Sequence, residues 1–288
     1  MKAKINGTEI FFDVEGKQFV PDEKKMREKP VCFLAHGGPG CDHTVYVPGV
    51  SELSDSMQLV YIDNRGSGRS GYPNPSTYTL ENNIEDIESL RKYLGLDKIV
   101  LLGQSYGGMI AQGYAVKYQE HLSALILVTT APSYRYIKEA EAELKKRGTK
   151  EQIEMGKYLF EGSFKSNDQF RQFFKLFGNL YSVNNYDEKA SNEAFDREIL
   201  SYQALNLGMS DFMTKFDYLE QLSEIKVPTL IIGARWDWIT PVENTYRIAK
   251  KIPHGRVVIL EHSSHSVFVD EPEKSLGAIR DFINQALC

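Results

Sequence analysis

The chain has 288 residues, of which 42% are hydrophobic and 25% charged; it can bury a large core, and disordered, collagen-like and coiled-coil chains are excluded. Its 34 basic and 39 acidic residues give a formal net charge of −5, which offers no basic field for nucleic acid or anionic lipid. Three cysteines without CxxC spacing favour a reducing, cytoplasmic compartment over a disulfide framework or a zinc site.

The first expected element is a β-hairpin within residues 3–14, because Asn6-Gly7 is a favoured type I′ turn pair between two strand-like segments. The charged stretch 16–29 is expected to form a loop. The apolar run at residues 10–12 is too short for a signal-peptide core or a membrane span. We therefore expect neither a membrane partner nor a targeting segment.

Short apolar runs then alternate with helix-like segments. Such nearly continuous runs indicate parallel strands that are covered on both faces. Residues 106–118 place apolar side chains along one helical face, which predicts a crossover helix. The four runs in this part of the chain are VCFLAH from residue 31, LVYID from 59, IVLLG from 99 and ALILVT from 124.

The alternation stops over residues 133–225, where charged helical sequence and a phenylalanine-rich stretch replace it. Connecting loops are usually about two to six residues long, so this segment is an insertion or a second domain. Two further strand-like runs follow, and residues 272–287 form an amphipathic helix. The prediction is an α/β fold with a mostly parallel sheet flanked by helices, whose core combines residues 1–132 and 226–288.

Residues 103–107 read Gly-Gln-Ser-Tyr-Gly and match the pentapeptide GxSxG. They follow a predicted strand and precede the predicted crossover helix, which is the setting of a nucleophile elbow. A glycine-rich turn without chemistry is the alternative, and the strand-turn-helix context favours the elbow. Ser105 is therefore the predicted nucleophile.

A serine hydroxyl needs a base within hydrogen-bond reach, and a carboxylate must orient that base. On an elbow scaffold the chain order is serine, acid, histidine. Asp237 and His265 each follow a predicted strand near the C-terminus and satisfy this order. His262 is the rival base, while Asp270 and Glu271 are rival acids that come after the histidine and are explained as charges at a helix start.

The glycine-rich loop at residues 36–40 follows the first parallel strand. A tetrahedral intermediate needs preorganised donors for its oxyanion, and glycines let the backbone approach closely. We assign this oxyanion hole to the backbone N–H groups of Gly38 and Tyr106, with Gly37 as the alternative to Gly38. A tight turn without a ligand is the competing interpretation.

Taken together, HGGPG at 36–40, DNRGSGRS at 63–70 and GQSYGG at 103–108 resemble the proline iminopeptidase family, as does the spacing of Asp237 and His265. The resemblance covers the whole chain. It implies an α/β-hydrolase fold of the serine peptidase type, with the same catalytic serine, aspartate and histidine. It also implies that residues 133–225 form a helical cap that selects the substrate.

Members of this family recognise a cationic free amine with acids from the cap and, in some members, with the residue after the catalytic aspartate. That position is Trp238 in this chain, which indicates a more apolar pocket. By resemblance, Asp211 in the cap is the candidate amine anchor; a helix cap or a solvated side chain is the alternative. Gly37 is also expected at the substrate, and an accessible Cys41 would make activity sensitive to thiol reagents.

The DNRGSGRS motif has a separate structural interpretation. Asp63 ends a predicted strand and is expected to cap the following turn, while Arg65 and Arg69 are expected to pair internally instead of contacting substrate.

The sequence thus predicts a serine hydrolase without cofactors, because it has neither a metal-binding cluster nor a dinucleotide motif after the first strand. The resemblance implies an aminopeptidase that releases N-terminal proline or another residue from small peptides, amides or arylamides. An esterase, lactonase or amidase for uncharged substrates is the alternative suggested by Trp238. A ligand-binding relative with little turnover is a third, and the intact triad argues against it. The oligomeric state is left open.

Overall fold

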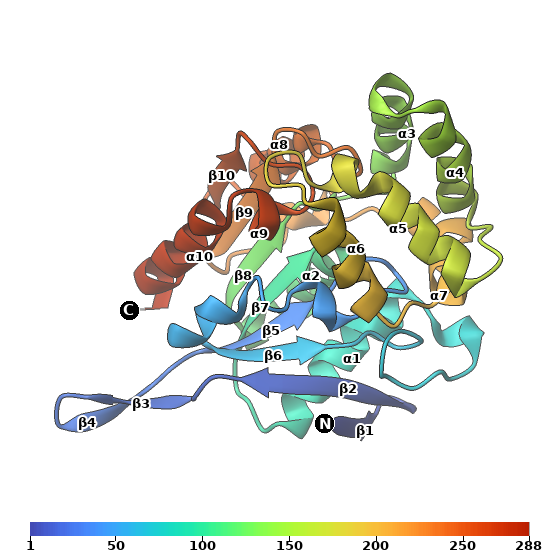
Figure 1. The fold of residues 1–288 in the computed structure, drawn as a ribbon. Coiled ribbons are helices and arrows are strands. Elements are labelled where there is room, and N and C mark those ends of the chain that lie inside the picture. The colour runs from blue at the N-terminus through green and yellow to red at the C-terminus, as the bar shows by residue number, and fades with distance from the viewer. Residues whose placement is uncertain (288) are drawn as a thin grey trace.

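The computed structural model describes residues 1–287 and contains one large sheet (Figure 1). Its strand order is β1-β2-β6-β5-β7-β8-β9-β10. Strand β1 pairs antiparallel with β2, and β2 pairs antiparallel with β6. The remaining neighbours in this order, from β6 through β5 to β10, pair in parallel. The strands are β1 (Lys2–Ile5), β2 (Thr8–Glu15), β5 (Val31–Ala35), β6 (Gln58–Ile62), β7 (Ile99–Gln104), β8 (Leu122–Val128), β9 (Thr229–Ala234) and β10 (Arg256–Leu260). The predicted α/β class with a mostly parallel sheet is confirmed.

Helices cover both faces of the sheet, which explains the uninterrupted apolar runs. Side chains alternate along a strand, so Leu101 packs on one face and Leu102 on the other. The first face is covered by α1 (Leu80–Tyr93), α2 (Tyr106–Tyr118) and α8 (Val242–Lys251), and the second mainly by α10 (Pro272–Leu287). Within residues 1–287, no helix combines the length and the apolar composition that crossing a membrane requires.

The N-terminal hairpin is confirmed, and Asn6 and Gly7 both have the positive φ of a type I′ turn. The prediction of a loop over residues 16–29 is wrong, because β3 (Phe19–Asp22) and β4 (Lys25–Glu28) pair as a second hairpin. This hairpin projects from the body of the molecule (Figure 1). Its backbone groups bond to each other, so it forms without the buried face that the sequence interpretation required of a strand.

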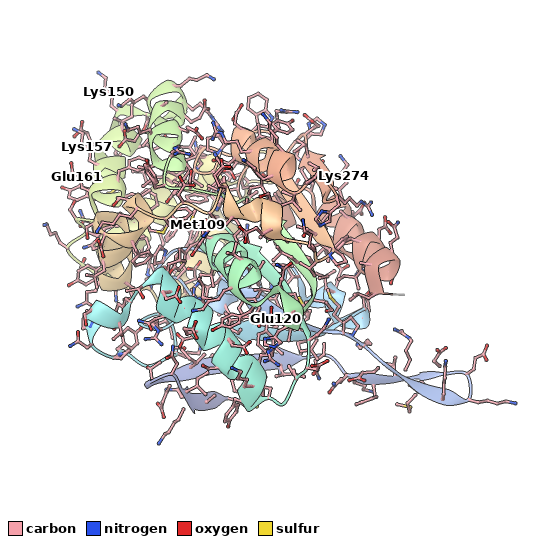
Figure 2. The ribbon with its side chains drawn as sticks, turned by 180° about the vertical axis from the view of Figure 1, so that it is seen from behind. Met109, Glu120, Lys150, Lys157, Glu161 and Lys274 are labelled. Atoms are coloured by element: carbon pink, nitrogen blue, oxygen red, sulfur yellow. The ribbon has the colours of Figure 1, made fainter. Side chains whose placement is uncertain are left out.

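Five α-helices lie between β8 and β9 and pack above the carboxyl ends of the parallel strands (Figure 1). They are α3 (Tyr136–Arg147), α4 (Lys150–Glu161), α5 (Asn167–Tyr181), α6 (Glu188–Arg197) and α7 (Tyr202–Ser210). The phenylalanines of α5 form a buried aromatic cluster facing the core. The charged side chains of Lys150, Lys157 and Glu161 on α4 lie on the outer side (Figure 2).

Candidate active site

Ser105 sits on a sharp turn between β7 and α2, with φ 56° and ψ −122°. A non-glycine residue is strained in this region. The turn is held because the N–H of Ser105 donates to the carbonyl of Val128 (3.0 Å) and Thr130 Oγ1 donates to the carbonyl of Ser105 (2.7 Å). The strand-turn-helix context predicted for the serine is therefore present.

The flanking glycines make the turn sterically possible. A Cβ on Gly103 would lie 2.2 Å from the carbonyl oxygen of Gly107, and a Cβ on Gly107 would lie 1.8 Å from that of Ala35. Both contacts are with backbone atoms, which have no free rotation to move aside. The two glycines therefore allow the elbow to pack against β5.

Gly107→Ala is expected to destabilise the protein by about 3 kcal/mol or more, because the elbow would have to separate from β5. The matched control is Gly277→Ala in α10, where an added Cβ meets no atom within 4 Å. That change should be neutral or stabilising by up to about 1 kcal/mol. Denaturant unfolding of both variants measures this, and equal stabilities would contradict the packing argument.

Asp237 and His265 follow β9 and β10 and form a hydrogen-bonded pair, with Nδ1 of the imidazole 2.8 Å from Oδ2 of the aspartate. Oδ1 of Asp237 accepts from the N–H groups of Ile239 and Thr240 at 2.9 Å each, and Oδ2 accepts from the Thr240 hydroxyl at 2.8 Å. These donors fix the carboxylate so that it holds the imidazole by Nδ1. The other ring nitrogen, Nε2, is thereby left for a proton from the serine.

The rival residues have other contacts. The side chain of His262 is exposed, and the backbone N–H of this residue donates to the carboxylate of Glu271. The same carboxylate also accepts from the hydroxyl of Ser263. Asp270 is buried and accepts from the N–H groups of residues 183 and 184 and of Ser264. Both acids directly precede α10, as the interpretation of charges at a helix start expects, and their carboxylates also organise neighbouring loops. Within residues 1–287, neither hydrogen-bonds to the imidazole of the Asp–His pair.

The loop at residues 36–40 presents backbone donors beside the serine. His36 Nε2 accepts from the N–H of Asn64 (3.0 Å), so its Nδ1–H donates to the carbonyl of Gly37 (2.6 Å). Burial lowers the pKa of His36, which keeps this neutral form. A trans peptide points its N–H away from its C=O, so the Gly38 N–H faces away from the imidazole. Gly37 and Gly38 both line the pocket with Ser105.

The pocket lies between the core and the inserted helices, and Ser105 and His265 are both at its wall. Met109 of α2 also lines it and is labelled near the middle of the molecule in Figure 2. Most of the remaining wall is apolar and comes from the helices α3 to α7 and from the short 3-10 helix Phe212–Thr214. These side chains are Tyr136, Leu159, Phe170, Phe173, Phe174, Tyr181, Phe195, Leu205, Met209 and Met213.

Two residues predicted at the substrate lie elsewhere. Trp238 is fully buried and packs behind the pocket wall against Phe173, Phe177 and Tyr181. The prediction that Trp238 contacts substrate is wrong, because its indole fills the junction between the core and α5. Asp211 ends α7 with an exposed carboxylate that pairs with Lys215. It does not line the pocket, so the predicted amine anchor is corrected as well.

Glu198 is the pocket residue that the sequence interpretation missed. It directly follows α6, is only 5% exposed and lines the pocket with the serine. Within the described residues its Oε2 has no hydrogen-bond partner. Burial and the charge of Asp42 raise the pKa of Glu198 to about 8, although the nearby Cys41 thiol lowers it. No sequence motif marks the position, because it is an acid in an irregular segment between two helices.

Asp42 ties the glycine-rich loop to the segment that carries Glu198. Its Oδ2 accepts from the N–H of Ile199 (3.0 Å) and from Arg69 Nη1 (2.7 Å). The carbonyl of Gly40 accepts from the N–H of Ser201 (2.8 Å). The loop and the inserted segment are therefore held together at two points just after the acid in the chain.

The DNRGSGRS motif supplies this scaffold. Arg65 forms a two-point ion pair with Asp86 at 2.6 and 2.7 Å, so the expected internal pairing of the arginines is confirmed. The side chains of Asp42, His43 and Asp63 also lie close enough together to ligate a metal. Their oxygens instead accept hydrogen bonds within the motif and its neighbours, including those from the N–H groups of residues 43 and 69 to Asp63. We assign the cluster a structural role.

Cys41 lines the pocket but is buried, and burial is the main cause that raises the pKa of its thiol well above the ordinary value. The thiolate, which reacts with thiol reagents, is therefore disfavoured. Sensitivity to thiol reagents was expected only if Cys41 were accessible, and the structure shows that it is buried.

The fold, with a serine on its elbow and an Asp–His pair at the next strand ends, defines a hydrolase of the α/β-hydrolase class. The model of the alpha/beta hydrolase fold family matches residues 30–272. The proline iminopeptidase PfmaB of Pestalotiopsis fici is 32% identical over 98% of this chain and 99% of its own length. The proline iminopeptidase of Saccharolobus solfataricus is 36% identical over 87% of this chain and 83% of its own length. The chain belongs to the proline iminopeptidase family.

A solved structure agrees with this assignment at the level of the fold. The proline iminopeptidase of Mycobacterium smegmatis matches with a TM-score of 0.76 at 18% identity, over 99% of this chain and 98% of that one. At this identity the likeness extends to the fold alone.

Proposed function

We propose that this enzyme is an aminopeptidase that releases an N-terminal residue, proline above all, from short peptides, amides and arylamides. Ser105 attacks the carbonyl carbon while His265 takes the serine proton, and the N–H groups of Gly38 and Tyr106 receive the oxyanion. His265 then protonates the leaving nitrogen as the C–N bond breaks. Water, deprotonated by the same imidazole, hydrolyses the acyl-enzyme.

The observation that carries this proposal is the buried carboxyl group of Glu198 in the pocket of the serine, whose wall is mostly apolar. Its Oε2 is buried without a hydrogen-bond partner, which is costly unless a ligand compensates it. The ammonium group of a free N-terminus supplies both the charge and the hydrogen bonds. The apolar side chains around it suit a proline ring.

The raised pKa of Glu198 predicts a pH dependence. With an empty pocket and a pKa of about 8, the carboxyl holds its proton at neutral pH. An ammonium binds the ionised form, so binding must release that proton below pH 8. The kcat/KM for a free-amine substrate should therefore rise, relative to that of an N-acetylated one, as the pH approaches 8.

The test is Glu198→Gln, assayed with a proline arylamide, its N-acetylated form and a simple nitrophenyl ester. A buried charge pair contributes about 1.5 to 3 kcal/mol, so kcat/KM for the free-amine substrate should fall about 10- to 150-fold. The other two substrates should be little affected, and the relative pH rise should disappear. Asp211→Asn is the matched control and should leave all three rates unchanged, because its carboxylate is exposed.

The second candidate function is hydrolysis of uncharged esters, lactones or amides, and the apolar wall of the pocket favours it. In that case the wild type would cleave the N-acetylated substrate or the ester at least as well as the free amine. Glu198→Gln would then affect all three substrates alike. This result would replace the aminopeptidase proposal.

Residues 133–225 are proposed to act as a cap domain on a core of residues 1–132 and 226–288. The support is that α3 to α7 contribute most of the pocket wall opposite the serine. A cytoplasmic location is part of the same proposal, supported by the free, buried thiols of Cys32 and Cys41.

A further inference from the structure

A second cavity adjoins the pocket of the serine, between α6, the loop at residues 44–49 and the short helix α9 (Val267–Asp270). The two cavities share the side chains of Val45, Phe195, Glu198 and Ser266 as common wall. They are therefore neighbouring compartments separated by these four residues. The mechanism uses only the first one.

The second cavity begins beside the residue that follows His265. The imidazole of His265 has to reach the scissile nitrogen to protonate it, and the adjacent residue, Ser266, lines both compartments. In an aminopeptidase substrate the free amine and the scissile nitrogen are three bonds apart. An acid that anchors the amine must therefore also lie close to the exit of the leaving group, as Glu198 does.

The wall of this cavity combines apolar and polar side chains, and Arg197 is the basic residue in its lining. Val45, Val47 and Val269 line it and are exposed, although large aliphatic side chains are usually buried. Arg197 also lines it, is exposed, and forms no ion pair within residues 1–287. Asp187, the other exposed charged residue of the lining, accepts from the helix N–H of residue 190 as the cap of α6.

We propose that this cavity binds the part of a short peptide that follows the scissile bond, with its free C-terminal carboxylate on Arg197. Consecutive residues lie about 3.8 Å apart, and a dipeptide spans at most about 7 Å. Arg197 and Glu198 are adjacent, but one side chain is exposed and the other is buried. They are thus placed to hold the two oppositely charged ends of a dipeptide. This assignment rests on the proposed aminopeptidase function and narrows its substrates to dipeptides with an apolar second residue.

The experiment compares prolyl-leucine, prolyl-leucine amide, prolyl-glycine and a proline arylamide as substrates of the wild type and of Arg197→Gln. The variant should raise KM for prolyl-leucine about threefold to tenfold with little change in kcat. KM for the amide and the arylamide should not change, because they carry no carboxylate. Wild-type KM should be lower for prolyl-leucine than for prolyl-glycine. Arg27→Gln, an exposed arginine on the projecting hairpin, is the control for net charge.

Each alternative result has a definite meaning. A similar loss on all the substrates would mean that Arg197 acts on Glu198 and not on a carboxylate, and would overturn the proposal. So would a variant without any effect, or equal KM values for the leucine and glycine dipeptides. If the wild type cleaved no free-amine substrate at all, the aminopeptidase function would fail first, and this assignment with it.

Discussion

Ser105→Ala is expected to lower kcat/KM by at least about 10³-fold on every substrate, while leaving the folded structure unchanged. The hydroxyl is the only group removed, and alanine can hold the same positive φ at the same strain as serine. The elbow bonds of residue 105 use its backbone N–H and carbonyl, which alanine keeps. Thermal unfolding should therefore match the wild type, and a fluorophosphonate probe should no longer label the protein.

Ser266→Ala is the matched control, because it removes a second hydroxyl from the same pocket. It should keep most of the activity and should still be labelled by the probe. Retention of more than about one thousandth of the rate in Ser105→Ala would argue against covalent catalysis through this residue. A wild type no faster than Ser105→Ala would favour the interpretation as a ligand-binding relative.

The core and the elbow were predictable from the sequence because local patterns determine them. The apolar runs that begin at residues 31, 59, 99 and 124 lie on β5, β6, β7 and β8, and the amphipathic pattern from Pro272 lies on α10. A strand buried on both faces has a nearly continuous apolar sequence wherever it occurs. The hairpin of β3 and β4 was missed because its side chains are largely exposed and show no such pattern.

The position of Glu198, the proposed amine anchor, was not predictable, because it depends on how the helices α3 to α7 fold over the strand ends. Asp211 and Glu198 are both acids of this segment, and sequence alone gives no reason to prefer the second. The structure separates them by burial: Asp211 pairs with Lys215 at the surface, while Glu198 is enclosed between the inserted segment and the glycine-rich loop. Trp238 was placed at the substrate because it follows Asp237, but its ring turns into the aromatic cluster of α5.

Asp237→Asn is expected to lower kcat by about 10⁴-fold, with KM and stability little changed. The amide oxygen can still accept from the N–H groups of Ile239 and Thr240, so the side chain should keep its orientation. The amide nitrogen then faces Nδ1 of His265 and donates to it. The neutral imidazole then carries its proton on Nε2. In this form Nε2 cannot accept the proton of the serine.

Asp270→Asn distinguishes this effect from a general loss of structure. Its carboxylate accepts from several donors, among them the N–H of Ser264 and the hydroxyl of Ser182. An amide replaces an acceptor with a donor, so this variant should lose about 1 to 3 kcal/mol of unfolding free energy and keep most of its kcat. Activity assays and denaturant unfolding of both variants separate the two effects. If Asp270→Asn abolished turnover in the folded protein and Asp237→Asn did not, Asp237 would not be the acid that orients the base.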